Sequence, residues 1–170
     1  IAMGNSVILS GGAIGGDIYG GVSALSEGTG VGGSATGNSV TISGAPNLAN
    51  SRLYGGIVRN GTDPLVVRAG DAFSGNTLNI KTSGLTVRGL YNFQNINFYL
   101  PSSLAAGDTA LTTTVEARLS ENSDGTGRKA TINVGVAGGA APLKNGDHVV
   151  LINAGTLTGT PANSTVNSQG

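Results

Sequence analysis

A short phrase that recurs three times is the feature that most limits how this chain can fold. It reads Gly-Asn-Ser-Val-Ile-Leu-Ser-Gly from Gly4 to Gly11, Gly-Asn-Ser-Val-Thr-Ile-Ser-Gly from Gly37 to Gly44, and Gly-Asn-Thr-Leu-Asn-Ile from Gly75 to Ile80. The copies begin 33 and 38 residues apart, a spacing typical of stacked repeat proteins. The chain is therefore expected to be built from similar units that lie one above another.

A second phrase travels with the first one. It reads Ile18-Tyr19-Gly20-Gly21, then Leu53-Tyr54-Gly55-Gly56, and then, with changes, Leu90-Tyr91-Asn92-Phe93. The three tyrosines are 35 and 37 residues apart, so the two phrases report the same unit. We expect the tyrosines, with Phe93, to lie at equivalent positions and to form an aromatic ladder that supports the fold, with a sugar-stacking surface as the alternative.

Composition favours an ordered, turn-rich protein and argues against a disordered chain, a nucleic-acid or anionic-membrane partner, and a disulfide framework. Gly accounts for 30 of the 170 residues, but Leu, Ile, Val and Phe are gathered in short apolar runs, which disordered chains lack. Nine basic residues balance nine acidic ones, so the sequence has no electrostatic signature of a nucleic-acid partner or an anionic membrane surface. There is no cysteine, which excludes disulfides.

The apolar residues of the first phrase alternate with polar ones. Val40 and Ile42 point to one face of a strand and Thr41 to the other, and the other copies have the same pattern. Identical strands more than 30 residues apart, with no helix signal between them, predict a parallel β-solenoid with apolar ladders inside and polar ladders outside. The segments 22–36 and 57–74 are expected to be loops that project from its corners.

The repeat fades after the third copy. From about Tyr99 the predicted strands share no phrase, and the polar segment Glu121–Lys129 is expected to be the turn of a hairpin. A terminal coil exposes strand edge and core unless something covers it. We therefore predict solenoid repeats over residues 1–98 and a less regular C-terminal β cap over 99–170, with the residues after about 160 forming a linker.

These residues resemble the passenger repeats of Gram-negative autotransporters, the type V secreted surface proteins. The repeated Gly-Asn-Ser phrase with its Tyr-Gly-Gly echo is similar to those repeats, and Leu143–Gly159, Asn97–Pro101 and Gly107–Thr112 are similar to the segment that closes such passengers. The resemblance covers most of the chain. It implies a right-handed parallel β-helix, a capping or autochaperone region at the C-terminal end, and a location on the bacterial cell surface. The targeting segments and the membrane barrel of such a protein are expected outside this sequence.

No catalytic, cofactor-binding or metal site is predicted. The single histidine, His148, stands at a strand edge without a partner motif, and Gly12–Tyr19 departs from the calcium-binding nonapeptide that it partly matches. The Gly-rich stretch Gly28–Gly37 lacks the features of a phosphate loop. The acidic residues show no adjacent pair: Asp17, Glu27, Asp63, Asp71, Asp108, Glu116, Glu121, Asp124 and Asp147.

The leading functional hypothesis is a non-enzymatic surface passenger that acts as a rigid stalk and folding cap, with a role in adhesion. Its expected partners are a host surface protein, a glycan, or the same protein on another cell, and it needs no cofactor. Two alternatives stay open. One is a polysaccharide-active β-helix enzyme, either a lyase or a tailspike-like hydrolase. The other is a host-binding module that uses the segments 22–36 and 57–74 as its contact surface.

Overall fold

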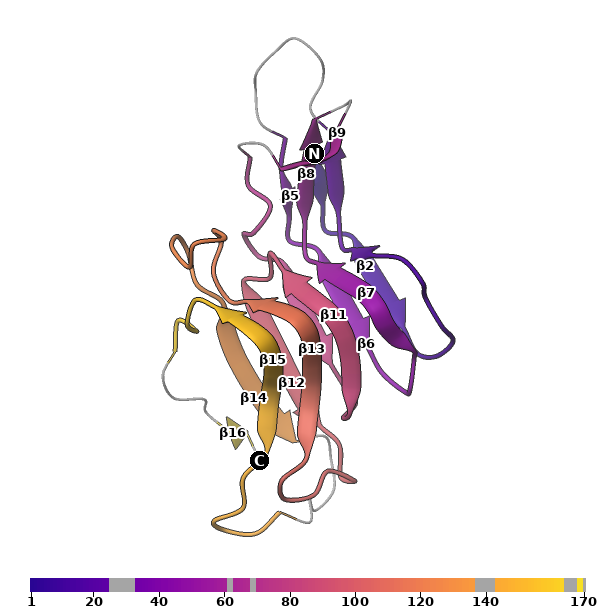
Figure 1. Ribbon diagram of the computed structural model, residues 1–170, viewed down its shortest axis with the longest axis vertical. Helices are drawn as coiled ribbons and strands as arrows, with labels where there is room; N and C mark the ends of the chain where they lie inside the picture. Colours follow the sequence, from indigo (N-terminus) through magenta and orange to yellow (C-terminus); the bar gives the residue numbers. More distant parts are fainter. Residues whose placement is uncertain (25–32, 61–62, 68–69, 137–142, 164–167, 170) are drawn as a thin grey trace.

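The protein is all-β in every part that the structure describes. The computed structural model describes the chain except residues 25–32, 61–62, 68–69, 137–142, 164–167 and 170 (Figure 1). The described residues form strands joined by turns, with no helix among them, and hence none that could cross a membrane. Two parallel sheets dominate the molecule and two small sheets lie beside its N-terminal part.

The larger sheet contains every copy of the repeated phrase. Each phrase forms one strand, and strands from later parts of the chain extend the sheet in parallel, in the order β16-β14-β12-β10-β6-β2. The strands are β2 (Ser6–Leu9), β6 (Ser39–Ile42), β10 (Thr77–Ile80), β12 (Asn95–Leu100), β14 (Thr131–Val136) and β16 (Ser168–Gln169).

The second sheet contains the tyrosine phrase. It has five parallel strands in the order β15-β13-β11-β7-β3, and its register shifts between Val87 and Gly89 and between Thr113 and Glu116. Its strands are β3 (Ile18–Tyr19), β7 (Leu48–Tyr54), β11 (Leu85–Tyr91), β13 (Thr109–Arg118) and β15 (Val150–Thr158). The chain enters the two sheets alternately, so each pass adds one strand to each sheet.

The segments expected to be loops contain strands. Residues 22–36 include β4 (Val22–Ala24) and β5 (Ala35–Thr36), and residues 57–74 include β8 (Ile57–Asn60) and β9 (Asp63–Val67). β5 pairs with β1 (Ala2–Met3), while β4, β8 and β9 form a three-stranded sheet whose β8–β9 pair is antiparallel. The loop prediction was wrong there because these short runs form strands that pair with one another or with β1.

The core lies between the two main sheets and consists of stacked apolar side chains. Val40, Leu78 and Ile96 are paired across neighbouring strands, and none of the three is exposed. The next inward position carries Ile42, Ile80 and Phe98 in the same way. The predicted all-β class with parallel stacking and inner apolar ladders is therefore confirmed. The coil and its hand remain a proposal.

The predicted polar ladder is present on the outer face of the six-stranded sheet. The side-chain amide of Asn133 donates to the Oδ1 of Asn97 at 2.9 Å, and Asn97 donates in turn to the Oδ1 of Asn79 at 2.9 Å. Asn79 donates to the Oγ1 of Thr41 at 3.2 Å. Because every link joins neighbouring strands at one register position, the outer face repeats the order of the core.

The glycine that opens each phrase forms a corner of the chain. Gly4, Gly37 and Gly75 have φ values of 67°, 65° and 67°, in the left-handed region that residues with a Cβ rarely adopt. The asparagine that follows is fully buried in the second and third copies, as Asn38 and Asn76. Asn38 donates hydrogen bonds to the side-chain oxygen of Asn76. The phrase therefore links neighbouring passes of the chain in addition to forming a turn.

Both main sheets continue past residue 99, where the repeat fades in the sequence. β12 pairs with β14 over six residues, and β13 pairs with β15. The division into repeats over 1–98 and a cap over 99–170 remains a prediction about sequence and folding. The hairpin expected at Glu121–Lys129 is only local: Ser120 and Lys129 form an antiparallel bridge, but β13 and β14 on either side enter different sheets.

Candidate functional site

The three repeated tyrosines form one stack on the outer face of the five-stranded sheet. The ring centroids of Tyr19 and Tyr54 are 5.1 Å apart with planes inclined by 17°, and those of Tyr54 and Tyr91 are 5.0 Å apart with planes inclined by 20°. Strand pairing places the three residues at one register position. The predicted ladder is confirmed for the tyrosines, whereas Phe93 is fully buried in the core, just after a corner at Asn92.

An arginine lies over the ring at each end of the stack. The guanidinium carbon of Arg118 is 4.9 Å from the centroid of Tyr91, and that of Arg59 is 4.9 Å from the centroid of Tyr19. Tyr91 stands between Tyr54 on β7 and Arg118 on β13, and Tyr54 stands between two tyrosines. Both faces of these two rings are covered, so a sugar cannot stack on them, and the geometry favours the supporting role.

Charged residues lie beside the stack, two positions before Tyr19, Tyr54 and Arg118 along the chain. Asp17 accepts a hydrogen bond from the Arg52 backbone N–H at 2.9 Å, and the guanidinium of Arg118 donates to both oxygens of Glu116 at 3.0 and 3.2 Å. Burial and the Glu116 charge raise the pKa of Tyr91. Burial also acts to raise the pKa of Glu116, but hydrogen bonds from Arg118, Thr158 and Tyr91 outweigh it and lower that pKa. The Tyr91 ring therefore lies beside the Arg118–Glu116 ion pair.

An open groove of about 570 Å³ runs between the tyrosines and the turn that follows β13. Tyr54 and Tyr91 line one side, and the turn residues 121–124 line the other. Asn92 also lines the groove, and it is the only non-glycine residue of the described chain with a positive φ, 62°. Earlier copies of the phrase have Gly20 and Gly55 at this position. Asn92 donates its amide to the carbonyl of Gly56 at 2.9 Å, so its conformation is held by the neighbouring pass.

Arg128 holds that turn against an earlier pass of the chain. Its guanidinium lies 2.7 Å from Glu121 and 3.1 Å from Asp71, hydrogen bonds to Ser74, and stands 5.3 Å from the ring centroid of Phe73. Glu121 and Asp71 raise the pKa of Arg128, and Arg128 lowers the pKa of Glu121. Asp71 and Glu121 are thus brought together as partners of one cation, which is the geometry of an ion-pair cluster and not of an acid pair sharing a substrate.

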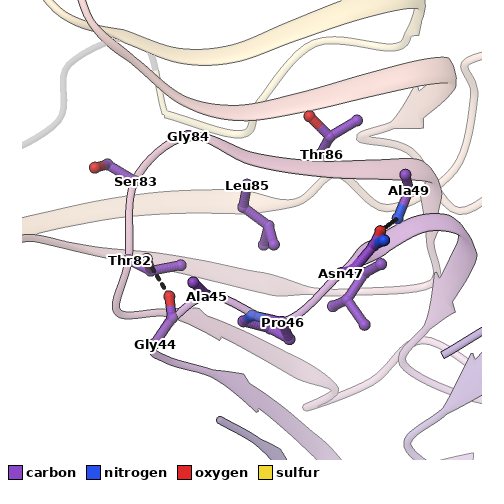
Figure 2. Close-up of a pocket in the computed structure, with 11 residues that line it drawn as sticks. Gly44, Ala45, Pro46, Asn47, Ala49, Thr82, Ser83, Gly84, Leu85 and Thr86 are labelled. Carbon is purple, nitrogen blue, oxygen red and sulfur yellow. Dashed lines mark hydrogen bonds between the residues drawn. The ribbon is translucent and has the colours of Figure 1, made fainter. Parts of the chain in front are cut away.

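A second concavity, of about 310 Å³, lies where two corners stack at the start of β7 and β11 (Figure 2). The tyrosines stand at the other end of these two strands. Gly44–Ala49 forms one wall and Thr82–Thr86 the other, and the hydroxyl of Thr82 donates to the carbonyl of Gly44 at 2.6 Å. Its lining contains no ionisable side chain. The groove beside the tyrosines is therefore the stronger candidate for polar chemistry.

The other residues singled out in the sequence are not brought together. His148 is exposed, and its carbonyl accepts a hydrogen bond from Gly107. Asp17, the acid of the partial calcium motif, contacts Arg52. No group of three or more acidic or histidine side chains able to hold a metal occurs among the described residues. Part of Gly28–Gly37 and parts of the segments 22–36 and 57–74 lie outside the described residues.

Comparison with known proteins adds no assignment. No family model matches this chain, and no curated protein sequence or solved structure matches it at a significant level. The arginine ends of the tyrosine stack and the Arg128 cluster had no signal in the sequence, because each joins residues far apart that share no repeated phrase. Only the tyrosine spacing pointed to this surface.

Proposed function

We propose that the chain is a rigid, non-enzymatic stalk segment of an autotransporter passenger, displayed outside the bacterial cell. The observation that supports this most directly is the constant register: the same phrase positions meet across β2, β6 and β10, and the pairing continues into β12 and β14. A stack of parallel strands with inner apolar and outer amide ladders resists bending, because each pass contacts its neighbours along its whole length. Such a structure suits a spacer better than it suits an enzyme.

The finer form that we propose is a right-handed parallel β-helix. Alternate entry of the chain into two parallel sheets is the path that such a coil requires. Its hand follows from the general preference of parallel crossovers and from the autotransporter resemblance. In this proposal the C-terminal passes over residues 99–170 cover the apolar end of the repeats and nucleate their folding.

The covering role is supported by what the later passes bury. Leu111 on β13 is fully buried against Leu85 on β11, and Ile132 on β14 is 8% exposed against Ile96 on β12. Without β13 and β14, Leu85 and Ile96 would each border solvent at an unpaired edge of its own sheet. Adhesion remains part of the proposal through a host protein, a glycan, or the same protein on another cell.

Removal of residues 99–170 tests the proposal. We expect residues 1–98 alone to aggregate or to lose hydrogen-exchange protection in β6 and β10, whereas the full chain stays protected. A soluble, monomeric and protected 1–98 fragment would contradict the folding-cap role. Turnover of a polyuronate or a bacterial glycan by the full chain, lost when a specific carboxylate is replaced, would instead favour the polysaccharide-active enzyme.

A further inference from the structure

Two successive passes of the chain make the same tight turn before they enter the five-stranded sheet. Ala105–Asp108 precedes β13, and Lys144–Asp147 precedes β15. In each turn the N–H of the aspartate donates to the carbonyl of the first residue, at 3.1 and 3.0 Å, and the N–H of that first residue donates to the aspartate carboxylate, at 2.8 and 2.7 Å. The third residue is a glycine with positive φ in both turns, 84° at Gly107 and 95° at Gly146. These contacts involve the first, third and fourth positions, so the side chain at the second is not needed.

The second position holds Ala106 in one turn and Asn145 in the other, and both residues are exposed. Within the described chain, the amide of Asn145 makes no hydrogen bond and the N–H of Gly146 donates none. Because the same turn forms with alanine, the asparagine side chain does not hold it. The turn before β15 therefore places an unbonded side-chain amide next to an unbonded backbone nitrogen.

We propose that Asn145 is a site of spontaneous modification, at which it loses ammonia and becomes an aspartate or an isoaspartate. The backbone nitrogen of Gly146 gives up its proton to water and attacks the side-chain carbonyl carbon of Asn145. A new C–N bond forms and the amide C–N bond breaks, while the leaving nitrogen takes a proton from water, so ammonia departs and a five-membered succinimide remains. Water then opens the ring at either carbonyl. The step needs no oxidant, reductant or cofactor.

The glycine makes this position reactive. It has no Cβ to shield the attacking nitrogen, and its backbone rotates more freely than that of other residues. Ring closure needs a rotation about the Asn145 Cα–C bond, which an exposed turn outside the sheets permits more readily than a strand does. Asn38 and Asn76 are instead fully buried. A second Asn-Gly pair begins at Asn60, but its glycine lies outside the described residues.

Isomerisation should loosen the entry to β15. An isoaspartate adds one atom to the backbone of the turn and a carboxylate to its side, and this turn is tied to the preceding pass, because the Gly107 N–H donates to the His148 carbonyl at 2.7 Å. The other end of β15 is held separately, by the bond from the Leu119 N–H to the Thr158 carbonyl at 2.8 Å. We expect faster hydrogen exchange at Gly107 in the modified chain and unchanged exchange at Leu119.

The test incubates the full chain at 37 °C from pH 7 to pH 8.5 and locates the product by peptide mass mapping and isoaspartate-specific methyltransferase labelling. We expect Asn145 to convert at least tenfold faster than Asn122, which is also exposed in a turn but precedes serine and donates its amide to Thr126 at 3.1 Å. The rate should rise with pH, because the attacking nitrogen must lose its proton. Equal rates at the two residues, or no isoaspartate at position 145, overturn the proposal.

Two variants separate the chemistry from the fold. Asn145→Ala copies Ala106 of the matching turn, so it should remove the product and leave the exchange of Gly107 unchanged. Asn145→Gln keeps an exposed amide, but attack on it would form a six-membered ring, so conversion should be at least tenfold slower. Conversion of Asn145→Gln at the native rate would indicate direct hydrolysis of an exposed amide and would contradict the succinimide route.

Discussion

The side-chain oxygen of Asn76 accepts two hydrogen bonds from Asn38, one from the backbone N–H at 3.0 Å and one from the amide at 3.2 Å. Neither residue has any exposed surface. The Asn76 amide in turn donates to two carbonyls, those of Ala35 and Ala72, at 2.9 and 2.6 Å. A buried side chain that satisfies its own groups and two main-chain carbonyls couples two passes of the chain.

Asn76→Asp should therefore be strongly destabilising. The substitution replaces two amide donors with acceptor lone pairs, leaves two buried carbonyls unpaired and buries a charge, so we expect a loss of about 3 kcal/mol in the free energy of unfolding. Urea denaturation at pH 7 measures it. Asn133→Asp is the matched control, because Asn133 is exposed and donates one bond to Asn97. Equal losses in the two variants would contradict the role of the buried Asn38–Asn76 link.

The phrase containing these asparagines explains why much of the fold was predictable. Alternation at Val40, Thr41 and Ile42 identifies an inner and an outer face, and a constant period places equal residues next to each other. Parallel pairing, the inner ladders, the outer amide ladder and the tyrosine stack all follow from these two facts. The corner glycines were predictable as well, because only glycine adopts a positive φ readily.

What the sequence did not predict depends on contacts outside the repeat. The pair Arg128 and Asp71 is separated by 57 positions and belongs to no phrase, and Arg118 replaces a tyrosine at the end of the stack. The strands β4, β8 and β9 lie in segments whose lengths differ between passes, so they carried no periodic signal. The polar turn after β13 was recognised, but a sequence alone does not say which sheet the following strand joins.

Removing the middle ring of the tyrosine stack should cost more than removing an exposed tyrosine. Tyr54→Ala deletes two ring contacts on a partly buried face, and we expect a loss of about 2 kcal/mol. Tyr99→Ala is the control, because Tyr99 is 39% exposed, its ring centroid lies 5.4 Å from the Lys81 ammonium, and it stacks on no other ring among the described residues. Thermal unfolding followed by circular dichroism compares them. A smaller loss for Tyr54→Ala than for Tyr99→Ala would count against a structural stack.

The glycine after Tyr54 is required by the neighbouring pass. A Cβ added at Gly55 would stand 2.2 Å from the carbonyl oxygen of Asn92 and 2.7 Å from the Cβ of Asn76. Both neighbours are backbone or buried, so neither can move aside easily, and Gly55→Ala should cost about 3 kcal/mol. Gly135→Ala, where a new Cβ meets no atom within 4 Å, should be close to neutral in the same urea titration. A neutral Gly55→Ala would show that the passes can separate.

The Arg128 cluster should make stability depend on acid pH. Burial acts to raise the pKa of Asp71, but hydrogen bonds from Ser74, Phe73 and Arg128 outweigh it, and the pKa lies below the ordinary value of 3.8. Arg128 likewise lowers the pKa of Glu121 from its ordinary 4.5. A carboxyl whose pKa is lower in the folded state stabilises the fold fully above its unfolded pKa, and the contribution disappears as pH falls through the folded pKa.

Arg128→Gln tests this dependence. The side chains involved are about a third to two fifths exposed, so solvent screening limits the expected loss to about 1 kcal/mol at pH 7. Below about pH 4 these two carboxyls take up protons in the unfolded chain before they do so in the folded one, and the difference between the native chain and Arg128→Gln should shrink as the pH falls toward the lowered pKa values of the folded state. Urea titrations from pH 7 to pH 2 measure it, with Arg88→Gln as the control because Arg88 is exposed and has no ion pair among the described residues. A difference that stays constant down to pH 2 would mean that Arg128 holds the turn through its contact with the Phe73 ring, and not through Asp71 and Glu121.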